Sequence, residues 1–268
     1  MMRKTFVIFG LLVVLVFSLY FYFKPKPCYH FSQKAFSSII PPTVEWTDEL
    51  ITLKATDEIR DILSLKYQFL GKGKQAFSFV SEDEKYVVKF FNLSNVIPSW
   101  KDCFYPEIAL KKQKKLKRLF FGYHNGYQEL KEDTGLIWIH LKPTHDLRRT
   151  ITLVDPQKNE LHVDADRTIF VIQKKAEPIL SHLSKLYEEG KSSEADQLIQ
   201  AFYALVQRKV SKGFHDRDKI FQNNYGFVEN QPIQFDLGKN KQMKNPKDEV
   251  EYFKAKIEQW KAEHGYPS

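Results

Sequence analysis

Residues 67–91 read YQFLGKGKQAFSFVSEDEKYVVKFF, and this stretch decides the fold that we predict for the chain. Three short runs rich in aromatic and β-branched residues are typical of strands. Gly71 and Gly73 interrupt the chain after the first run, and the polar residues 81–84 separate the second run from the third. The stretch therefore predicts three consecutive strands joined by short turns.

The residues that follow predict one helix, more strands, and then mostly helices. Pro106 suits the first position of a helix, and residues at helical spacing predict its buried face, namely Ile108, Leu116, Leu119, Phe120 and Tyr123. Strands are expected at 136–141, 151–156, 160–165 and 168–173. Beyond them we expect helices at 177–190 and 192–210, a polar loop at 211–224, a strand pair at 225–238 and a charged helix near 247–264.

The residues that precede the three strands begin with an apolar segment. Residues 5–23 read TFVIFGLLVVLVFSLYFYF, nineteen residues without a charge, which is about the length that crosses a bilayer core. We expect a single-pass transmembrane helix, and a cleaved signal peptide is the alternative. Basic residues are balanced on its two sides, so the side of the membrane that the body faces stays open. The proline-containing residues 24–46 predict a stalk, and residues 47–65 predict a helix capped by Thr47.

The expected elements give an α+β fold with two lobes. A β-rich lobe spans residues 66–176, and a helical lobe spans residues 177–268. With 268 residues, 43% of them hydrophobic and 28% charged, the composition excludes a disordered, collagen-like or coiled-coil chain. Cys28 and Cys103 are too few for a disulfide-rich mini-fold or an all-cysteine zinc site. Whether the two cysteines form a bridge, and whether the chain forms oligomers, stays open.

The chain is basic, with 41 Lys and Arg against 33 Asp and Glu, a formal net charge of 41 − 33 = +8. Six bases crowd the eight positions from Lys111 to Arg118. Such a run can contact anionic lipid headgroups, and a solvated helix face is the alternative. We do not expect nucleic acid as a partner, because the chain has no recognised binding motif and no aromatic platform near the basic run.

Four features of the sequence have the residue types that phosphoryl transfer requires. Gly71 and Gly73 form a G-x-G turn, whose backbone amides can approach phosphate oxygens. Lys89 lies in YVVK on the third predicted strand, where an apolar setting would hold its charge in place. Residues 216–223 read DRDKIFQN, and residues 236–238 read DLG. A carboxylate to orient a hydroxyl, together with acid and amide oxygens for Mg²⁺, completes such a site.

In these residues the chain resembles the protein-kinase-like superfamily over about residues 66–240. LGKGKQA resembles its Gly-rich loop, YVVK its third-strand lysine, DRDKIFQN its catalytic loop and DLG its metal-binding motif. The resemblance implies a two-lobed kinase-like fold that binds ATP and Mg²⁺, and a hinge at residues 170–176 beside the adenine. It implies these roles for single residues: Lys89 on the α/β-phosphates, Glu107 as its helix partner, Asp218 as the catalytic base, and Asn223 and Asp236 as Mg²⁺ ligands.

Departures from the superfamily pattern leave alternatives open. Ala76 stands where the third glycine belongs, and Asp216 stands where the histidine belongs. Thirty residues follow Gly238, so we expect a truncated helical lobe, as in small-molecule, sugar or lipid kinases of the superfamily. The first hypothesis is a membrane-anchored kinase-like enzyme acting on a small-molecule, sugar or lipid-linked hydroxyl.

Two further hypotheses belong to other classes. The second is a catalytically inactive pseudokinase that serves as a membrane-tethered binding module. The third is an anchored α+β protein in which Lys89 is a solvated strand residue, Asp218, Asn223 and Asp236 are turn residues, and Glu107 interacts with the helix dipole. A membrane location is expected in each case, with the body on the cytoplasmic side if the protein uses ATP.

Overall fold

The computed structural model of the chain describes residues 48–73, 75–92, 105–216, 220–237, 240–242 and 249–267. The three strands predicted from residues 67–91 are present, as β1 (Lys66–Lys72), β2 (Ala76–Ser81) and β3 (Tyr86–Phe91). Each pairs with the next in antiparallel register. The backbone N–H of Gly73 donates to the carbonyl of Ala76 at 2.9 Å, which closes the first turn.

Four more strands extend these three antiparallel strands to a seven-stranded sheet. They are β4 (Leu136–His140), β5 (Thr150–Val154), β6 (Glu160–Asp164) and β7 (Phe170–Lys174). The order across the sheet is β4-β7-β3-β2-β1-β5-β6. Only the pair of β1 with β5 is parallel among these neighbours, so the sheet is mixed. The predicted α+β class is confirmed, and β3 is an interior strand of the sheet, between β7 and β2.

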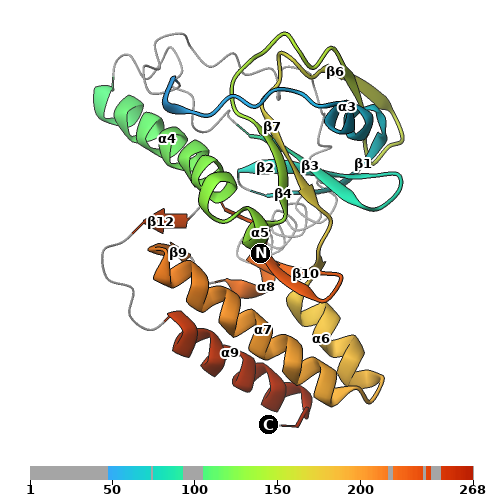
Figure 1. Cartoon of the computed structure of the whole chain (residues 1–268), viewed down its shortest axis with the longest axis vertical. Helices are drawn as coiled ribbons and strands as arrows, with labels where there is room; N and C mark the ends of the chain where they lie inside the picture. The colour runs from blue at the N-terminus through green and yellow to red at the C-terminus, as the bar shows by residue number, and fades with distance from the viewer. Residues whose placement is uncertain are drawn as a thin grey trace, which may run out of the picture. The chain divides into compact units, whose positions relative to one another are not determined.

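Helix α4 (Pro106–Glu129) connects β3 to β4 and packs on the sheet with its C-terminal half (Figure 1). Phe91 of β3 meets the rings of Phe120 and Tyr123 at centroid distances of 5.6 and 5.1 Å. The expectation that Ile108 belongs to the buried face is wrong, because its side chain is 45% exposed. Among the described side chains of α4, the first that is buried is Leu116, so the apolar spacing begins earlier in the helix than the burial does.

The helix predicted at 47–65 is shorter in the structure. Helix α3 spans Asp57–Ser64, and its N-cap is Thr56, whose hydroxyl accepts from the backbone N–H of Ile59 at 3.3 Å. Thr56 has two acidic residues in the turn that follows it, which favours a helix start at this threonine. A short helix, α5 (Lys131–Thr134), follows α4 and ends at Gly135, whose φ of +61° suits the left-handed C-cap position.

The chain after β7 forms the helical part of the molecule. Its elements are β8 (Glu177–Pro178), α6 (Ile179–Glu188), α7 (Ser192–Ser211), β9 (Phe214–Asp216), α8 (Phe221–Asn224), β10 (Tyr225–Val228), β11 (Gln231–Gln234), β12 (Asn240–Gln242) and α9 (Glu249–His264). Helices α7 and α9 lie side by side (Figure 1). Phe202, Tyr225 and Phe253 make the centre of its core, with ring centroids 5.2 to 5.6 Å apart. The polar loop predicted at 211–224 contains β9 and α8.

Several predicted features lie outside the described residues. These are the apolar segment 5–23, the stalk 24–46, Cys28, Cys103, Asp218 and Gly238. Among the residues that are described, the structure contains no helix that combines the length and the apolar character needed to cross a bilayer.

Candidate functional site

The register of the central strands brings Gly71, Ser78 and Lys89 into one row across the sheet. Gly71 of β1 pairs with Ser78 of β2, and Ser78 pairs with Lys89 of β3. Neighbouring strands are about 4.8 Å apart, so the glycine backbone lies about 10 Å from that of the lysine. Directly paired residues of antiparallel strands project to the same face. The hydroxyl of Ser78 and the ammonium group of Lys89 therefore share one face of the sheet.

The side chain of Lys89 is buried, with 8% of its surface exposed. Its ammonium group donates a hydrogen bond to the backbone carbonyl of Phe235 and lies 5.2 Å from the centroid of the Phe235 ring. Burial lowers the pKa of Lys89 to about 8, and the nearby carboxylate of Asp236 opposes this shift. A buried lysine near one carboxylate on the wall of a cavity is a candidate for binding an anion.

Lys209 of α7 is buried as well, but its environment differs. Burial lowers its pKa to about 8, and three carboxylates oppose the shift, those of Glu249, Asp216 and Asp133. Its ammonium group donates to the hydroxyl of Tyr225 at 2.6 Å. Buried networks of this kind hold a fold together and also perturb pKa values. Lys209 therefore serves as a structural comparison for Lys89.

The backbone of Phe235, Asp236 and Leu237 is held from two sides. The carbonyl of Asn224 in α8 accepts from the backbone N–H groups of Phe235 and Asp236 at 2.8 and 3.4 Å. The side-chain amide of Gln234 donates to the carbonyl of Asp236 at 3.0 Å. These bonds, with the one from Lys89, fix the backbone on which the carboxylate of Asp236 is mounted.

Helix α4 closes on the same segment through two glycines one turn apart. A Cβ atom at Gly122 would lie 2.7 Å from the carbonyl oxygen of Leu237, and a Cβ atom at Gly126 would lie 2.7 Å from its side-chain Cδ1. Between the glycines, the hydroxyl of Tyr123 is hydrogen-bonded by the backbone N–H of Leu237. Burial, with the negative charge of Asp236 nearby, raises the pKa of Tyr123. A glycine at each position allows the helix to approach the Asp236 segment closely.

A buried polar network holds Asn224, whose carbonyl binds the backbone of Phe235 and Asp236. Asp216 accepts from the side-chain amide of Asn224 at 2.7 Å, and burial raises the pKa of its carboxyl group. Glu249 of α9 contacts the backbone N–H of Asp216 at 3.4 Å and the Nδ1 atom of His215 at 2.9 Å. Asp216 thus holds Asn224 in place.

Lys89 and Asp236 line a cavity of about 390 Å³ together with residues from four other parts of the chain. Gly73 and Gln75 come from the turn before β2, Ala76 and Ser78 come from β2 itself, Tyr123 comes from α4, and Ile220, Asn223 and Asn224 come from the chain around α8. The cavity therefore carries one buried cation, one carboxylate, three amide side chains and two hydroxyls. This set can bind phosphate oxygens and a hydrated cation.

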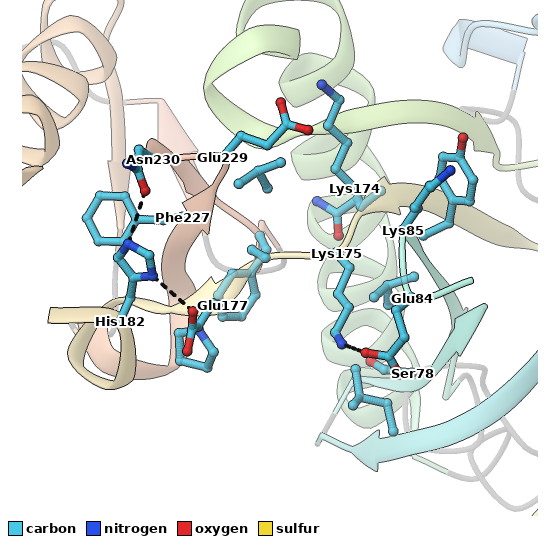
Figure 2. Close-up of a pocket in the computed structure, with 18 of the residues that line it drawn as sticks. Ser78, Glu84, Lys85, Lys174, Lys175, Glu177, His182, Phe227, Glu229 and Asn230 are labelled. Atoms are coloured by element: carbon cyan, nitrogen blue, oxygen red, sulfur yellow. Dashed lines mark hydrogen bonds and ion pairs between the residues drawn. The ribbon is translucent and has the colours of Figure 1, made fainter. Parts of the chain in front are cut away.

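A larger cavity of about 990 Å³ adjoins this one, since Ser78 and Lys89 line both. Figure 2 shows Lys85, Lys174 and Lys175 on one side of it, and His182, Phe227 and Asn230 on the other. Lys175 pairs with Glu84, and the two ring nitrogens of His182 contact Glu177 and Asn230 at 2.9 and 3.2 Å. Leu70, Val87 and Phe235 add apolar surface. The volume is at the upper end of the range typical of small-molecule sites.

The structure brings together four of the residues that the sequence singled out. Gly73, Lys89, Asn223 and Asp236 line the smaller cavity, and Gly71 pairs with Ser78 at its edge. The residues predicted as a hinge, 170–176, contribute Gln173, Lys174, Lys175 and Ala176 to the larger cavity. Asp218, the predicted base, lies outside the described residues.

The structure does not bring Glu107 to Lys89. Glu107 is exposed in the first turn of α4, whereas Tyr123, sixteen residues later in the same helix, lines the cavity with Lys89. At 1.5 Å per residue, the two positions are about 24 Å apart along the helix axis. The predicted pairing of Glu107 with Lys89 is therefore absent from the structure. Instead, the C-terminal half of α4 contacts the segment that contains Asp236.

Ser78, Tyr123 and Asn224 are site residues that sequence reasoning missed. Nothing in the local sequence marks Ser78 or Tyr123, because strand register and helix packing bring them to the cavity. Asn224 directly follows Asn223, and the spacing of the superfamily motif selects only the first of the two. The glycine pair at 122 and 126 was the one signal present, since two glycines inside a helix are costly without a packing reason.

Two residues are expected from the sequence to bind a metal ion, Asn223 and Asp236. Among the residues that the structure describes, no group of three or more His, Cys, Asp or Glu side chains is placed to hold a metal ion. Asn223 and Asp236 line one cavity and offer oxygen ligands, which Mg²⁺ prefers. Magnesium is commonly held by one or two carboxylates, with phosphate and water oxygens completing its shell.

Comparison with known proteins adds no relative. No protein-family model matches the sequence, and no curated protein is significantly similar to it.

We expect Gly122→Ala to destabilise the protein, although the same change in an ordinary helix interior stabilises by about 1 kcal/mol. The added methyl group would meet the backbone oxygen of Leu237, which cannot move without displacing Asp236. Gly126→Ala is the matched variant, because its methyl group meets the end of the flexible Leu237 side chain. In urea unfolding, the free energy of unfolding of Gly122→Ala should be lower than that of Gly126→Ala. A Gly122→Ala variant as stable as the wild type, or more stable, would contradict the close approach of α4 to the Leu237 backbone.

We expect the free energy of unfolding to rise between pH 8 and 10, partly through Lys89. Its pKa is about 8 in the folded protein against 10.5 for an unperturbed lysine, so in this range the unfolded chain binds the additional proton. Below pH 8 the burial of the charge costs about 3 kcal/mol in full. Lys89→Met should therefore increase the free energy of unfolding at pH 7 and reduce its increase between pH 8 and 10.

Chemical denaturation of both proteins across this pH range tests the assignment. Lys85→Met is the control, because the side chain of Lys85 is mainly exposed. If the free energy of unfolding depended on pH in the same way in the wild type and in Lys89→Met, the result would contradict the burial of Lys89.

Proposed function

We propose that the protein is a kinase-like phosphotransferase that binds Mg·ATP and transfers the γ-phosphoryl group to a hydroxyl. The observation that carries the proposal is the cavity that Lys89, Asp236, Asn223 and Gly73 line together. These residues are up to 163 positions apart in the sequence (236 − 73), and they were selected from it for phosphate chemistry. Their convergence supports a shared role.

The order of the elements also supports the proposal. A Gly-containing turn joins β1 to β2, the lysine lies on β3, and a helix follows β3 before the next strand. The resemblance to the protein-kinase-like superfamily implies this order. In the proposed fold, the sheet part and the helical part are the two lobes, and the two adjoining cavities lie along the nucleotide.

Each group in the site has a proposed part in binding. The ammonium group of Lys89 would bind the α/β-phosphates in place of the carbonyl of Phe235, which accepts its hydrogen bond in this structure. Phosphate charges would favour the protonated lysine and offset the cost of burying it. The oxygens of Asp236 and Asn223 would hold Mg²⁺, which when bound neutralises the charge that develops on the transferred phosphoryl group. The adenine would occupy the larger cavity beside residues 173–176.

We further propose that Asp218 orients the acceptor hydroxyl and takes its proton. The acceptor that fits a cavity of about 390 Å³ alongside the phosphates is small, such as a small molecule, a sugar or the headgroup of a lipid. The apolar segment 5–23 is proposed as a membrane anchor, and use of ATP would put the body on the cytoplasmic side.

Mg·ATP should stabilise the full chain against thermal unfolding. At a concentration 100 times the dissociation constant, a ligand stabilises by about 2.7 kcal/mol, which is several degrees in the midpoint. We expect the shift to require Mg²⁺ and to be lost in Lys89→Ala and Asp236→Ala. Glu107→Gln is the control, because Glu107 is remote from the cavity. A chain that shows no shift at millimolar ATP would be a scaffold or a fold with another ligand.

Asp218→Asn separates an enzyme from a pseudokinase. If Asp218 is the base, the variant should keep the Mg·ATP stabilisation and lose turnover by a factor of about 10² to 10⁴, the usual contribution of a general base. Release of ADP measures turnover with sugars and lipid headgroups as acceptors. Nucleotide binding without turnover in the wild type would favour the binding module over the enzyme.

A further inference from the structure

The N-terminal half of α4 extends beyond the core of the protein. None of the described side chains from residue 105 to residue 115 is buried, whereas buried residues recur from Leu116 onward. Three large apolar side chains are exposed here, with exposed fractions of 61% for Tyr105, 45% for Ile108 and 50% for Leu110. They are three of the five large hydrophobic residues that are exposed in the described part of the chain.

Bases surround these apolar side chains. Residues 106–118 contain six bases and one acid, Glu107, a net charge of 6 − 1 = +5. Lys111, Lys114, Lys115 and Arg118 are exposed and have no ion pair within the part of the chain that is described. Lys117 differs, because it lies 3.6 Å from Glu49 and 5.2 Å from the ring centroid of Phe121.

Apolar and basic side chains are interleaved on the helix surface. Residues three or four positions apart are neighbours on a helix, so Leu110 adjoins Lys114, and Ile108 adjoins Lys111. A solvated helix face needs no exposed apolar side chains, and the chain has no recognised motif for binding nucleic acid. Apolar side chains among lysines are the pattern of a helix that lies at the surface of an anionic membrane.

The same chain carries an apolar segment that is long enough to span a bilayer, residues 5–23. A second site on an anchored chain binds at a high effective concentration, so a contact that is weak by itself becomes well populated. Each base near an anionic surface adds about 1 kcal/mol. Lys111, Lys114, Lys115 and Arg118, together with the three exposed apolar side chains, are available for such a contact.

We propose that residues 105–118 of α4 bind the surface of an anionic lipid bilayer. Tyr105, Ile108 and Leu110 would lie at the boundary between headgroups and acyl chains, and Lys111, Lys114, Lys115 and Arg118 would contact headgroup phosphates. The surface is separate from the two cavities, and the inference does not rest on phosphoryl transfer.

A fluorescent reporter in the full chain tests this contact. Leu110→Cys, in a chain that also carries Cys28→Ser and Cys103→Ser, is labelled with an environment-sensitive fluorophore and reconstituted into bilayers. We expect the emission to move to shorter wavelength in phosphatidylcholine bilayers that contain phosphatidylserine, and not in phosphatidylcholine alone. High ionic strength should reverse the shift, because salt screens the charges. The same label at Gln259→Cys, on the exposed side of α9, should not respond.

Charge-removal variants separate a specific contact from general attraction. Replacing Lys111, Lys114 and Lys115 by Gln should lower the equilibrium constant of the contact roughly 100-fold. Replacing Lys158, Lys191 and Lys256 by Gln removes the same charge from exposed positions elsewhere and should leave the contact unchanged. Unchanged thermal unfolding in both triple variants verifies that they fold.

Three results would overturn the proposal. The first is an equal emission shift in neutral and anionic bilayers, or none in either. The second is an equal response of the two triple variants. The third is a shift with soluble heparin and none with bilayers, which would assign the surface to a soluble polyanion.

Discussion

The backbone segment Phe235–Leu237 is the point at which the sheet, helix α4 and the helical part of the molecule meet. Lys89 of β3 donates a hydrogen bond to the carbonyl of Phe235. The carbonyl of Asn224 accepts hydrogen bonds from the N–H groups of Phe235 and Asp236. Helix α4 approaches Leu237 closely at Gly122 and Gly126. The side chain of Leu237 is fully buried in the cluster between the sheet and α4. The position of the Asp236 carboxylate therefore depends on three separate elements at once.

This arrangement is costly in one respect, since it buries a lysine with one carboxylate nearby. Lys209 shows the alternative, in which the charges of three carboxylates oppose the effect of burial on the pKa and the ammonium group donates a hydrogen bond to the hydroxyl of Tyr225. A lysine retained without such compensation is typical of a site whose partner arrives from outside, because binding of an anion restores the missing interaction. The contrast between the two lysines is the physical basis for assigning binding to one and structure to the other.

Helix α4 has a different role at each end. Its 24 residues extend over about 36 Å. The C-terminal half supplies the aromatic residues that cover β3 and the two glycines that admit the Leu237 backbone. In the N-terminal half, none of the described side chains up to residue 115 is buried, and apolar residues are exposed among bases. Periodicity alone treats Ile108 and Leu116 alike, although only Leu116 is buried.

The sequence by itself determined the strands of the sheet, the helices α4, α6, α7 and α9, and the residue types of the site. Periodicity and turn residues act locally, so the three strands from residue 66 to residue 91 and the lysine on the third could be predicted without knowledge of their neighbours. Glu107 was misjudged as a partner of Lys89 because the local sequence does not reveal which turn of a helix will face the sheet.

Only the tertiary structure decided which of these residues meet. Strand register aligned Gly71, Ser78 and Lys89, and long-range packing brought Asp236 to them and Tyr123 to Asp236. The contacts of Asp236 join residues more than a hundred positions apart, and their geometry depends on close packing and on the satisfaction of buried polar groups across the whole molecule. These constraints leave no periodic pattern in the sequence, which is why the types of the site residues could be predicted and their partners could not.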